Sequence, residues 1–298
     1  MKGMVAALTL LPRLAGAATL CVGPGQTYAL PRQAIAAAHD GDTVAIAPGH
    51  YADCAIIRQQ SLTIEGTGPG VVLAGKSCGG QGILVALGDT LTVRNLTLRG
   101  SRVPNENGSG IRAGRSSLVV ENVRFENNQD GILTGINPAA TVLVSDSVFI
   151  GNGHCGADCA HAIYVGRFAR LEVIRSRFLG TREGHSIKSR AASTTIVDST
   201  IADGSAGTSS YAIDIPNGGD VLVAGDRIEK GPASENKATA IMIGEEGVTN
   251  ATRHLRFHDD LFINDTGQPS TFVRNLTQTV ADLSGNTFRG DPIILLAN

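Results

Sequence analysis

The chain contains no tryptophan among its 298 residues, and aromatic residues make up only 4% of it. Charged residues are also scarce, at 17%, and they nearly balance to a formal net charge of −2. A chain so close to neutral sets up no whole-molecule field that would attract nucleic acid or an anionic membrane. We therefore expect no nucleic acid among its partners, and any preference for an acidic ligand must be local.

Long apolar runs are also lacking after the N-terminus, so we expect no membrane insertion. The apolar stretch at residues 4–14 precedes Ala15-Gly16-Ala17, a small-x-small cleavage signal. We predict a signal peptide over residues 1–17 and a secreted or periplasmic protein; the alternative is an ordinary helical start. Leu20 precedes Cys21 where a lipoprotein would need a small residue, so we expect no acylation there.

The cysteines are few but informative, because five of them suit an oxidising compartment. Cys155 and Cys159 are close enough in sequence to form a small disulfide ring, which we favour. His154 and His161 bracket them, so a zinc site with reduced thiolates is the alternative. One further bridge and one free thiol remain, with the pairing left open among Cys21, Cys54 and Cys78.

What the chain has instead is 37 glycines and many aliphatic residues, arranged in a repeat. Each unit has two apolar residues in alternation, then Asn, Asp or Gly at a corner, then a large apolar residue. Copies begin at Leu91, Leu118, Val142, Leu171, Thr194, Val221, Leu255 and Ala281, with a degenerate earlier copy at Ile64. Period-two alternation predicts strands, and Asn, Asp or Gly tolerates the left-handed backbone of a sharp corner. The repeat predicts an all-β, single-stranded right-handed parallel β-helix of about nine coils over residues 18–298.

A second strand in each coil is centred on an aliphatic residue. These residues are Ile83, Ile111, Ile132, Ile163, Ile187, Ile213, Ile241, Val273 and Ile294. We expect them to form a column inside the solenoid, with both chain neighbours of each facing outward. The preceding neighbours are all small: Gly82, Gly110, Gly131, Ala162, Ser186, Ala212 and Ala240. They predict a flat outer strip along the solenoid with room for an extended chain.

Residues 18–50 are predicted to form an N-terminal cap and the first strand. The segment 31–39 is Ala-rich and predicts a short capping helix, and residues 42–46 predict the first strand. Such a helix would cover strand edges that are otherwise unpaired at the open end of the solenoid.

Polar chemistry is concentrated on the outward positions of the middle coils. We expect Tyr164, Lys188 and Asp214 in one column at about 4.8 Å spacing, with Arg190 on the same face. Four side chains stand two residues before the Ile positions, where loops enter: Asp130, His161, His185 and Tyr211. Candidate substrate-binding residues are Arg112, Asp130, Asp214, Asn217 and Arg167. The plainer interpretation, polar residues facing solvent, weakens because so many reactive types converge within about three coils.

Local charge also favours an anionic ligand. Residues 161–190 contain seven Lys or Arg against two Glu, although the whole chain is slightly acidic. We predict a positive patch there that attracts an acidic polysaccharide or oligosaccharide.

Five segments of the sequence resemble a known protein family. The strings at 107–112, 127–135, 161–167, 184–191 and 210–219 are similar to those of exported bacterial right-handed β-helix proteins of the pectate-lyase-like superfamily. The resemblance covers essentially the whole chain after the leader. It implies a fold shared by polysaccharide lyases, hydrolases and uronate epimerases, so it does not choose a reaction. The Arg-x-Pro-x-x-Arg stretch of pectate lyases is missing, and the paired aspartates of polygalacturonases are not recognisable.

We favour β-elimination on a uronic-acid-containing glycan. The reaction needs a cation for the substrate carboxylate, a base for the C5 proton and an acid for the leaving oxygen. Lys188 and Arg190 are the candidate cations. The candidate base is His185 or Tyr211, and the candidate acid is Tyr164 or His161. A C5-epimerase would share the proton abstraction.

Two other functions remain open. Hydrolysis needs two carboxyl groups about 5 to 9.5 Å apart, whereas Asp130 and Asp214 are three coils apart; Asp214 with Glu183 is the remaining pair. A non-catalytic glycan-binding or envelope scaffold would use the same surface, but with four Tyr its aromatic platform is thin. We expect a monomer without a metal or other cofactor, although calcium could bind through loop carboxylates such as Asp130 and Asp158.

Overall fold

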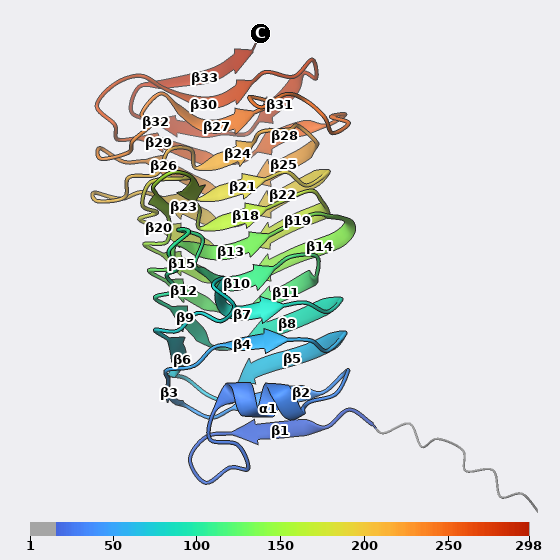
Figure 1. Ribbon diagram of the computed structural model, residues 1–298. Coiled ribbons are helices and arrows are strands. Elements are labelled where there is room, and N and C mark those ends of the chain that lie inside the picture. The colour runs from blue at the N-terminus through green and yellow to red at the C-terminus, as the bar shows by residue number, and fades with distance from the viewer. Residues whose placement is uncertain (1–15, 298) are drawn as a thin grey trace, which may run out of the picture.

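The computed structural model describes residues 16–297, which form a solenoid of stacked coils from one end to the other (Figure 1). The predicted signal peptide, 1–17, lies almost entirely outside the described residues. Three parallel sheets of 11, 10 and 10 strands run along the solenoid. The predicted parallel β-helix is therefore confirmed, but each coil has three strands where the sequence indicated two, because the large apolar residue after the corner has a short strand of its own.

We name the three sheets A, B and C in the order in which each coil contributes to them. Sheet A contains β1 (Thr19–Val22), β2 (Thr43–Ile46), β5 (Ser61–Gly66), β8 (Thr90–Arg94), β11 (Ser117–Glu121), β14 (Asn137–Ser145), β19 (Phe168–Ile174), β22 (Ser193–Val197), β25 (Asp220–Ala224), β28 (Leu255–His258) and β31 (Ala281–Ser284). Sheet B contains β3 (Gly49–Tyr51), β6 (Val71–Ala74), β9 (Thr97–Arg99), β12 (Arg124–Glu126), β15 (Val148–Ile150), β20 (Arg177–Leu179), β23 (Thr200–Ala202), β26 (Arg227–Lys230), β29 (Leu261–Asn264) and β32 (Thr287–Arg289). Sheet C contains β4 (Ala55–Ile57), β7 (Gly82–Ala86), β10 (Ser109–Ala113), β13 (Asp130–Thr134), β18 (Ile163–Val165), β21 (Ile187–Ser189), β24 (Ile213–Ile215), β27 (Thr239–Ile243), β30 (Ser270–Asn275) and β33 (Pro292–Ala297).

The corner between sheets A and B lies where the repeat predicts it. Eight successive corner residues have left-handed backbone angles, with φ between 46° and 71°: Asn95, Asn122, Asp146, Arg175, Asp198, Gly225, Asp259 and Gly285. Asn, Asp and Gly adopt this conformation at low cost, which explains why the repeat uses them. Arg175, at 46°, is the exception in residue type but not in geometry.

The aliphatic column inside sheet C is confirmed from Ile111 to Val273, where successive members pair in register. The predicted register is wrong at both ends of the column. Ile111 pairs with Leu84 in place of the predicted Ile83, and Val273 pairs with Leu295 in place of the predicted Ile294. Both end strands are apolar at consecutive positions, so the sequence there contains no alternation that could fix the register.

The predicted outer strip of small residues is wrong, because these residues lie inside. A Cβ atom added at Gly110 or Gly131 would come within 2.8 Å of the rings of Phe125 and Phe149. Those two rings stack with Phe178 at centroid distances of 4.5 and 4.6 Å in the core. The remaining small residues of the strip are buried as well: Ala162, Ser186, Ala212 and Ala240. Gly82 belongs to a different register position, opposite Ser109.

The N-terminal end carries the predicted helix, α1 (Pro31–Ala37), which buries Ala34 and Ile35 and packs against β4 (Figure 1). The strand β1 was not predicted, and it extends sheet A one coil beyond β2. Helix α1 has seven residues, and no helix within residues 16–297 has the length and hydropathy of a membrane span.

Both disulfides agree with the cysteine pattern. Cys155 bonds to Cys159 and Cys54 bonds to Cys78, while Cys21 is exposed and free. The zinc alternative is wrong because both sulfur atoms that it needs are in the disulfide. No three His, Cys, Asp or Glu side chains within residues 16–297 lie together in a way that could hold a metal ion.

Candidate active site

The outward face of sheet C brings the central candidates together. Tyr164 pairs with Lys188, and Lys188 pairs with Asp214, on the adjacent strands β18, β21 and β24. Arg190 lies just past β21 and reaches back, so that its Nε donates to Tyr164 Oη at 2.8 Å. These four residues therefore share one wall, as the register of the aliphatic column predicts.

Lys188 lies between two carboxylates. Its Nζ is 3.0 Å from Asp214 Oδ2, without hydrogen-bond geometry, and donates to Glu246 Oε1 at 2.9 Å. Burial disfavours the ammonium charge, but the two carboxylates outweigh it and raise the pKa of Lys188. Asp214 is fully buried, and burial raises its pKa to about 7 despite the ammonium. Lys188 is thus a fixed cation above a fully buried carboxyl group.

Glu246 is the residue that the sequence analysis missed. It lies in the exposed segment 245–249 after β27, and its Oε2 accepts a hydrogen bond from Arg190 Nη2 at 2.6 Å. Although partial burial opposes ionisation, the hydrogen bonds from Lys188 and Arg190 lower the pKa of Glu246. One signal could have found it, since the longest repeat spacing, 34 residues, contains Glu245 and Glu246 directly after a sheet C strand.

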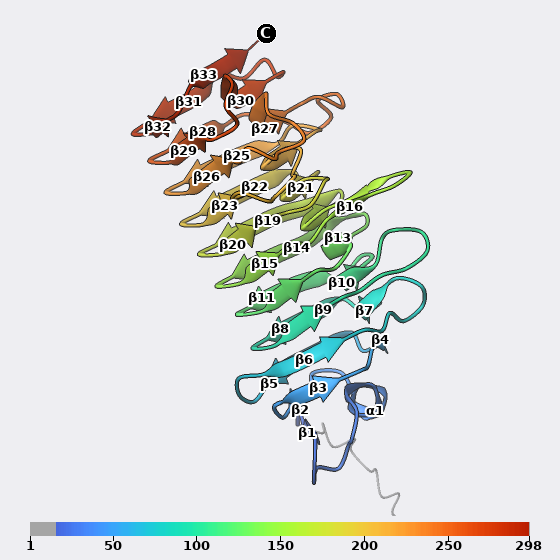
Figure 2. The same ribbon diagram turned by 90° about the vertical axis from the view of Figure 1, so that its left-hand side faces the viewer.

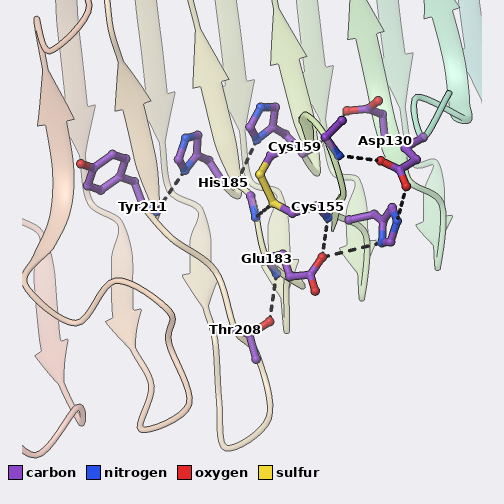
Figure 3. The surroundings of a disulfide bond; sticks show 12 residues. Asp130, Cys155, Cys159, Glu183, His185, Thr208 and Tyr211 are labelled. Atoms are coloured by element: carbon purple, nitrogen blue, oxygen red, sulfur yellow. Dashed lines mark hydrogen bonds and ion pairs between the residues drawn. A yellow bond between two sulfur atoms is a disulfide. The ribbon is translucent and has the colours of Figure 1, made fainter.

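Asp130, His161, His185 and Tyr211 form a row at the entrance of sheet C, which we call the lip ladder. Figure 3 labels three of its members, Asp130, His185 and Tyr211. Asp130 Oδ1 accepts the His161 N–H at 2.7 Å, His161 Nδ1 accepts the His185 N–H at 2.9 Å, and His185 Nδ1 accepts the Tyr211 N–H at 3.1 Å. The rings of His161 and His185 stack at 4.8 Å, and those of His185 and Tyr211 stack at 5.0 Å. Each Nδ1 is an acceptor, so the ring proton of each histidine is on Nε2.

This ladder changes the expected roles of its members. Burial lowers the pKa of His161 well below its usual value and, with the charge of Lys188, lowers that of His185 to about 3. Both rings are therefore neutral donors, and His185 Nε2 lies 3.4 Å from Asp214 Oδ2. Tyr211 donates to Glu245 Oε2 at 2.9 Å, and burial raises its pKa. The geometry thus argues against His185 and Tyr211 as the base.

Asp130 has the properties that those two residues lack. It is 1% exposed, its Oδ2 has no hydrogen-bond partner, and burial raises its pKa to about 7. Such a carboxyl group can exchange a proton near neutral pH. Arg112 lies two strands from Tyr164 and is half-buried; its charge partly opposes the shift at Asp130.

Two adjoining hollows lie over this wall and share Tyr164 and Arg190. The first, of about 460 Å³, is at the lip and is lined by Asn107, Asp130, Leu133, Asp158, Cys159, His161, Tyr164, His185, Lys188 and Arg190. The second, of about 340 Å³, is at the far ends of the strands and is lined by Thr134, Gly135, Ile136, Tyr164, Gly166, Arg167, Arg190, Asn217 and Thr249. The two hollows overlap from β13 to Arg190, but the first extends toward the N-terminal end of the solenoid to Asn107 and the second extends toward the C-terminal end to Asn217 and Thr249.

A hairpin closed by a disulfide borders the first hollow. Strands β16 (His154–Cys155) and β17 (Cys159–Ala160) project from the side of the solenoid (Figure 2). Glu183 accepts the Cys155 N–H beneath the hairpin (Figure 3), and Glu106 accepts the Ala157 N–H at 3.1 Å. Because Glu183 is engaged there, it does not fold over the wall toward Asp214, and that pair for hydrolysis is wrong.

No protein-family model matches the chain. No curated protein matches it either. Among solved structures, a pectin methylesterase from Aspergillus niger in penultimately deglycosylated form is similar, with 12% identity, 97% of this chain and 92% of that chain covered, and a TM-score of 0.42. The deglycosylated form of the same enzyme gives 11% identity, 96% and 91% coverage, and a TM-score of 0.43. Likeness at this level carries no information about the reaction.

The positive patch predicted over residues 161–190 is wrong as a patch. Arg170 is on sheet A beside Glu172 at 3.3 Å, and Arg175 pairs with Asp146 at 2.7 Å at the corner. The linear charge excess is thus distributed around the solenoid. Only Lys188 and Arg190 place their charges at both the wall and the first hollow.

Proposed function

We propose that the two hollows bind a uronic-acid-containing glycan and that the enzyme cleaves it by β-elimination. One observation carries the proposal: Lys188 and Arg190 hold a single carboxylate between them, that of Glu246, while Arg190 also contacts the Tyr164 hydroxyl. A substrate carboxylate seated in the same place would be neutralised beside a proton donor.

The reaction follows from the groups in the first hollow. Two cations on the carboxylate acidify the neighbouring C5–H bond, and Asp130, which lines the first hollow, removes that proton once substrate binding makes its buried Oδ2 accessible. The C–H electrons form the C4–C5 double bond as the C4–O bond breaks, and its electron pair goes to the leaving oxygen. Tyr164 protonates that oxygen, and solvent returns the proton from Asp130 to Tyr164 before the next cycle.

The remaining residues bind and orient the sugar in this proposal. His161 offers its Nε2–H to a substrate hydroxyl, and Arg167 and Asn217 in the second hollow contact the adjoining sugar. The two disulfides favour an oxidising compartment, so we propose that the protein is secreted or periplasmic. No step requires a metal ion.

A glycan screen tests the function. The purified protein is incubated with pectate, alginate, glucuronan and hyaluronan, and unsaturated uronates are followed by their absorbance. We expect one glycan to give the product, Tyr164→Phe and Lys188→Ala to abolish it, and Tyr28→Phe, at the N-terminal end, to leave it unchanged. If no glycan gives an absorbing product, elimination is wrong; an inverted C5 centre without absorbance would instead identify an epimerase.

A further inference from the structure

Glu246 occupies the two cations that the proposed function assigns to substrate. Its Oε1 accepts from Lys188 Nζ at 2.9 Å, and its Oε2 accepts from Arg190 Nη2 at 2.6 Å. While this side chain stays in place, neither cation has the same position free for another carboxylate. A uronate can contact both cations only by displacing it.

The backbone that carries Glu246 is fixed to the preceding coil. The Glu246 N–H donates to Pro216 O at 3.0 Å, the Thr249 N–H donates to Asn217 O at 3.0 Å, and Asn217 Nδ2 donates to Gly247 O at 3.1 Å. The Glu246 side chain, in contrast, is 40% exposed. Displacement can therefore be a rotation of one side chain into solvent and needs no movement of the loop.

The cations keep their positions when Glu246 leaves. Lys188 retains Asp214 at 3.0 Å, and Arg190 retains its hydrogen bonds to Tyr164 at 2.8 Å and to Asn217 at 2.5 Å. The receptor for a carboxylate is thus preorganised by residues other than Glu246, which lowers the cost of binding a replacement.

We infer that Glu246 is a specificity residue, an internal competitor that only a ligand with its own carboxylate displaces effectively. A methyl ester or a neutral sugar offers the two cations no charge, so displacing Glu246 leaves Arg190 without a carboxylate partner and Lys188 with Asp214 alone, in a partly buried site. A uronate exchanges one carboxylate for another at little net cost. This inference rests on the proposed function, from which it takes the class of ligand.

Calorimetry on three proteins tests it, with a galacturonate trisaccharide and its methyl ester as probes. We expect Glu246→Gln to bind the acid about tenfold more tightly than the wild type. We also expect the ester, which the wild type does not detectably bind, to bind this variant measurably. Glu245→Gln is the matched control and should behave as the wild type, because Glu245 accepts from Tyr211 and not from the cations.

Three outcomes would overturn the inference: an unchanged or weaker affinity of Glu246→Gln for the acid, equal binding of acid and ester by the wild type, or no binding by either protein. Adding Lys188→Ala to Glu246→Gln should remove most of the gain in affinity. Turnover is measured separately by absorbance. A gain in affinity without turnover contradicts elimination alone, whereas turnover without a gain in affinity contradicts the role of Glu246 alone.

Discussion

Two rows of side chains run along this solenoid, and both accept buried backbone N–H groups, but from opposite directions along the solenoid. The lip ladder lies at the entrance of sheet C. The second row, which we call the corner ladder, lies under the corner between sheets A and B and contains Ser147, Ser176, Ser199, Asp226 and Asp260. In both rows, a side chain in one coil accepts the backbone N–H of a residue of the row in an adjacent coil, so that buried donors are satisfied where the strands are interrupted.

The direction of the hydrogen bonds differs between the two ladders. In the corner ladder the acceptor belongs to the following coil, as when the Ser147 N–H donates to Ser176 Oγ at 3.1 Å and the Ser199 N–H donates to Asp226 Oδ1 at 2.6 Å. In the lip ladder the acceptor belongs to the preceding coil, as at His161 and Asp130. The corner ladder is enclosed, whereas Asp130, His161 and His185 of the lip ladder line a hollow. Side chains that accept backbone N–H groups are therefore candidates for catalysis only where loops leave a hollow beside them, as in the lip ladder.

The largest expected difference between the ladders is in activity. Asp130→Asn should lower kcat on the identified glycan by about 10²- to 10³-fold, because an amide cannot remove the C5 proton. Its oxygen can still accept the His161 N–H, so the stability of the fold should change little. Asp226→Asn, the matched change in the corner ladder, should leave kcat unaltered. Equal losses in the two variants would show that Asp130 is structural.

Breaking each ladder should cost a similar amount of stability. His185→Leu removes the acceptor of the Tyr211 N–H, and Ser176→Ala removes the acceptor of the Ser147 N–H. Each change leaves a backbone donor without its partner, and we expect the free energy of unfolding to fall by about 1–3 kcal/mol in either case. Denaturant titration measures the loss. His185→Asn, which retains an acceptor, should recover part of it; no recovery would locate the loss in ring stacking.

Asp226 of the corner ladder and His185 of the lip ladder should respond to pH in opposite directions. Burial raises the pKa of Asp226 from 3.8 to about 8, so the folded state favours its protonated form. Its contribution to stability is complete below 3.8 and is lost as pH rises toward 8. Burial lowers the pKa of His185 from 6.5 to about 3, so the folded state favours its neutral form. Its contribution to stability is complete above pH 6.5 and is lost as the pH falls toward 3.

The Asp226→Asn variant removes the ionisable group of the corner ladder and leaves His185 of the lip ladder unchanged, so it separates their contributions to the pH dependence of stability. We expect the variant to be more stable than the wild type at pH 8, by about 1 kcal/mol or more, and to gain less at pH 5. Thermal unfolding at the two pH values checks this. A gain that is the same at both values would contradict a role for ionisation at Asp226.

The smallest effect should come from the corner backbone. Arg175 adopts φ 46° where the other corners use Asn, Asp or Gly, and its pair with Asp146 is exposed. Arg175→Gly should raise the free energy of unfolding slightly, because relief of the left-handed conformation exceeds the value of an exposed ion pair. Arg177→Gly, on a neighbouring sheet B strand, is the control and should destabilise the protein.

Much of this architecture could be predicted from the sequence because alternation and corner residues are local signals. The pairing of Tyr164 with Lys188 and Asp214 follows from register alone once the aliphatic column is aligned. Gly110 and Gly131 were misplaced because the alternation ends where sheet B turns into sheet C, and only the position of the phenylalanine rings shows which side they face. Glu246 could not be placed, since its contact with Lys188 depends on how a loop 58 residues away folds back.

The stacked rings of Phe125, Phe149 and Phe178 belong to the same coils as β13, β18 and β21. Their centroid distances of 4.5 and 4.6 Å are close to the spacing of adjacent strands, so the close-packed rings help to fix the spacing of the coils behind the wall. The axial separations of Asp130, Tyr164 and Lys188 are consequently set from within the protein. Surface loops can lengthen, shorten or change partners without altering the distances on which proton transfer depends.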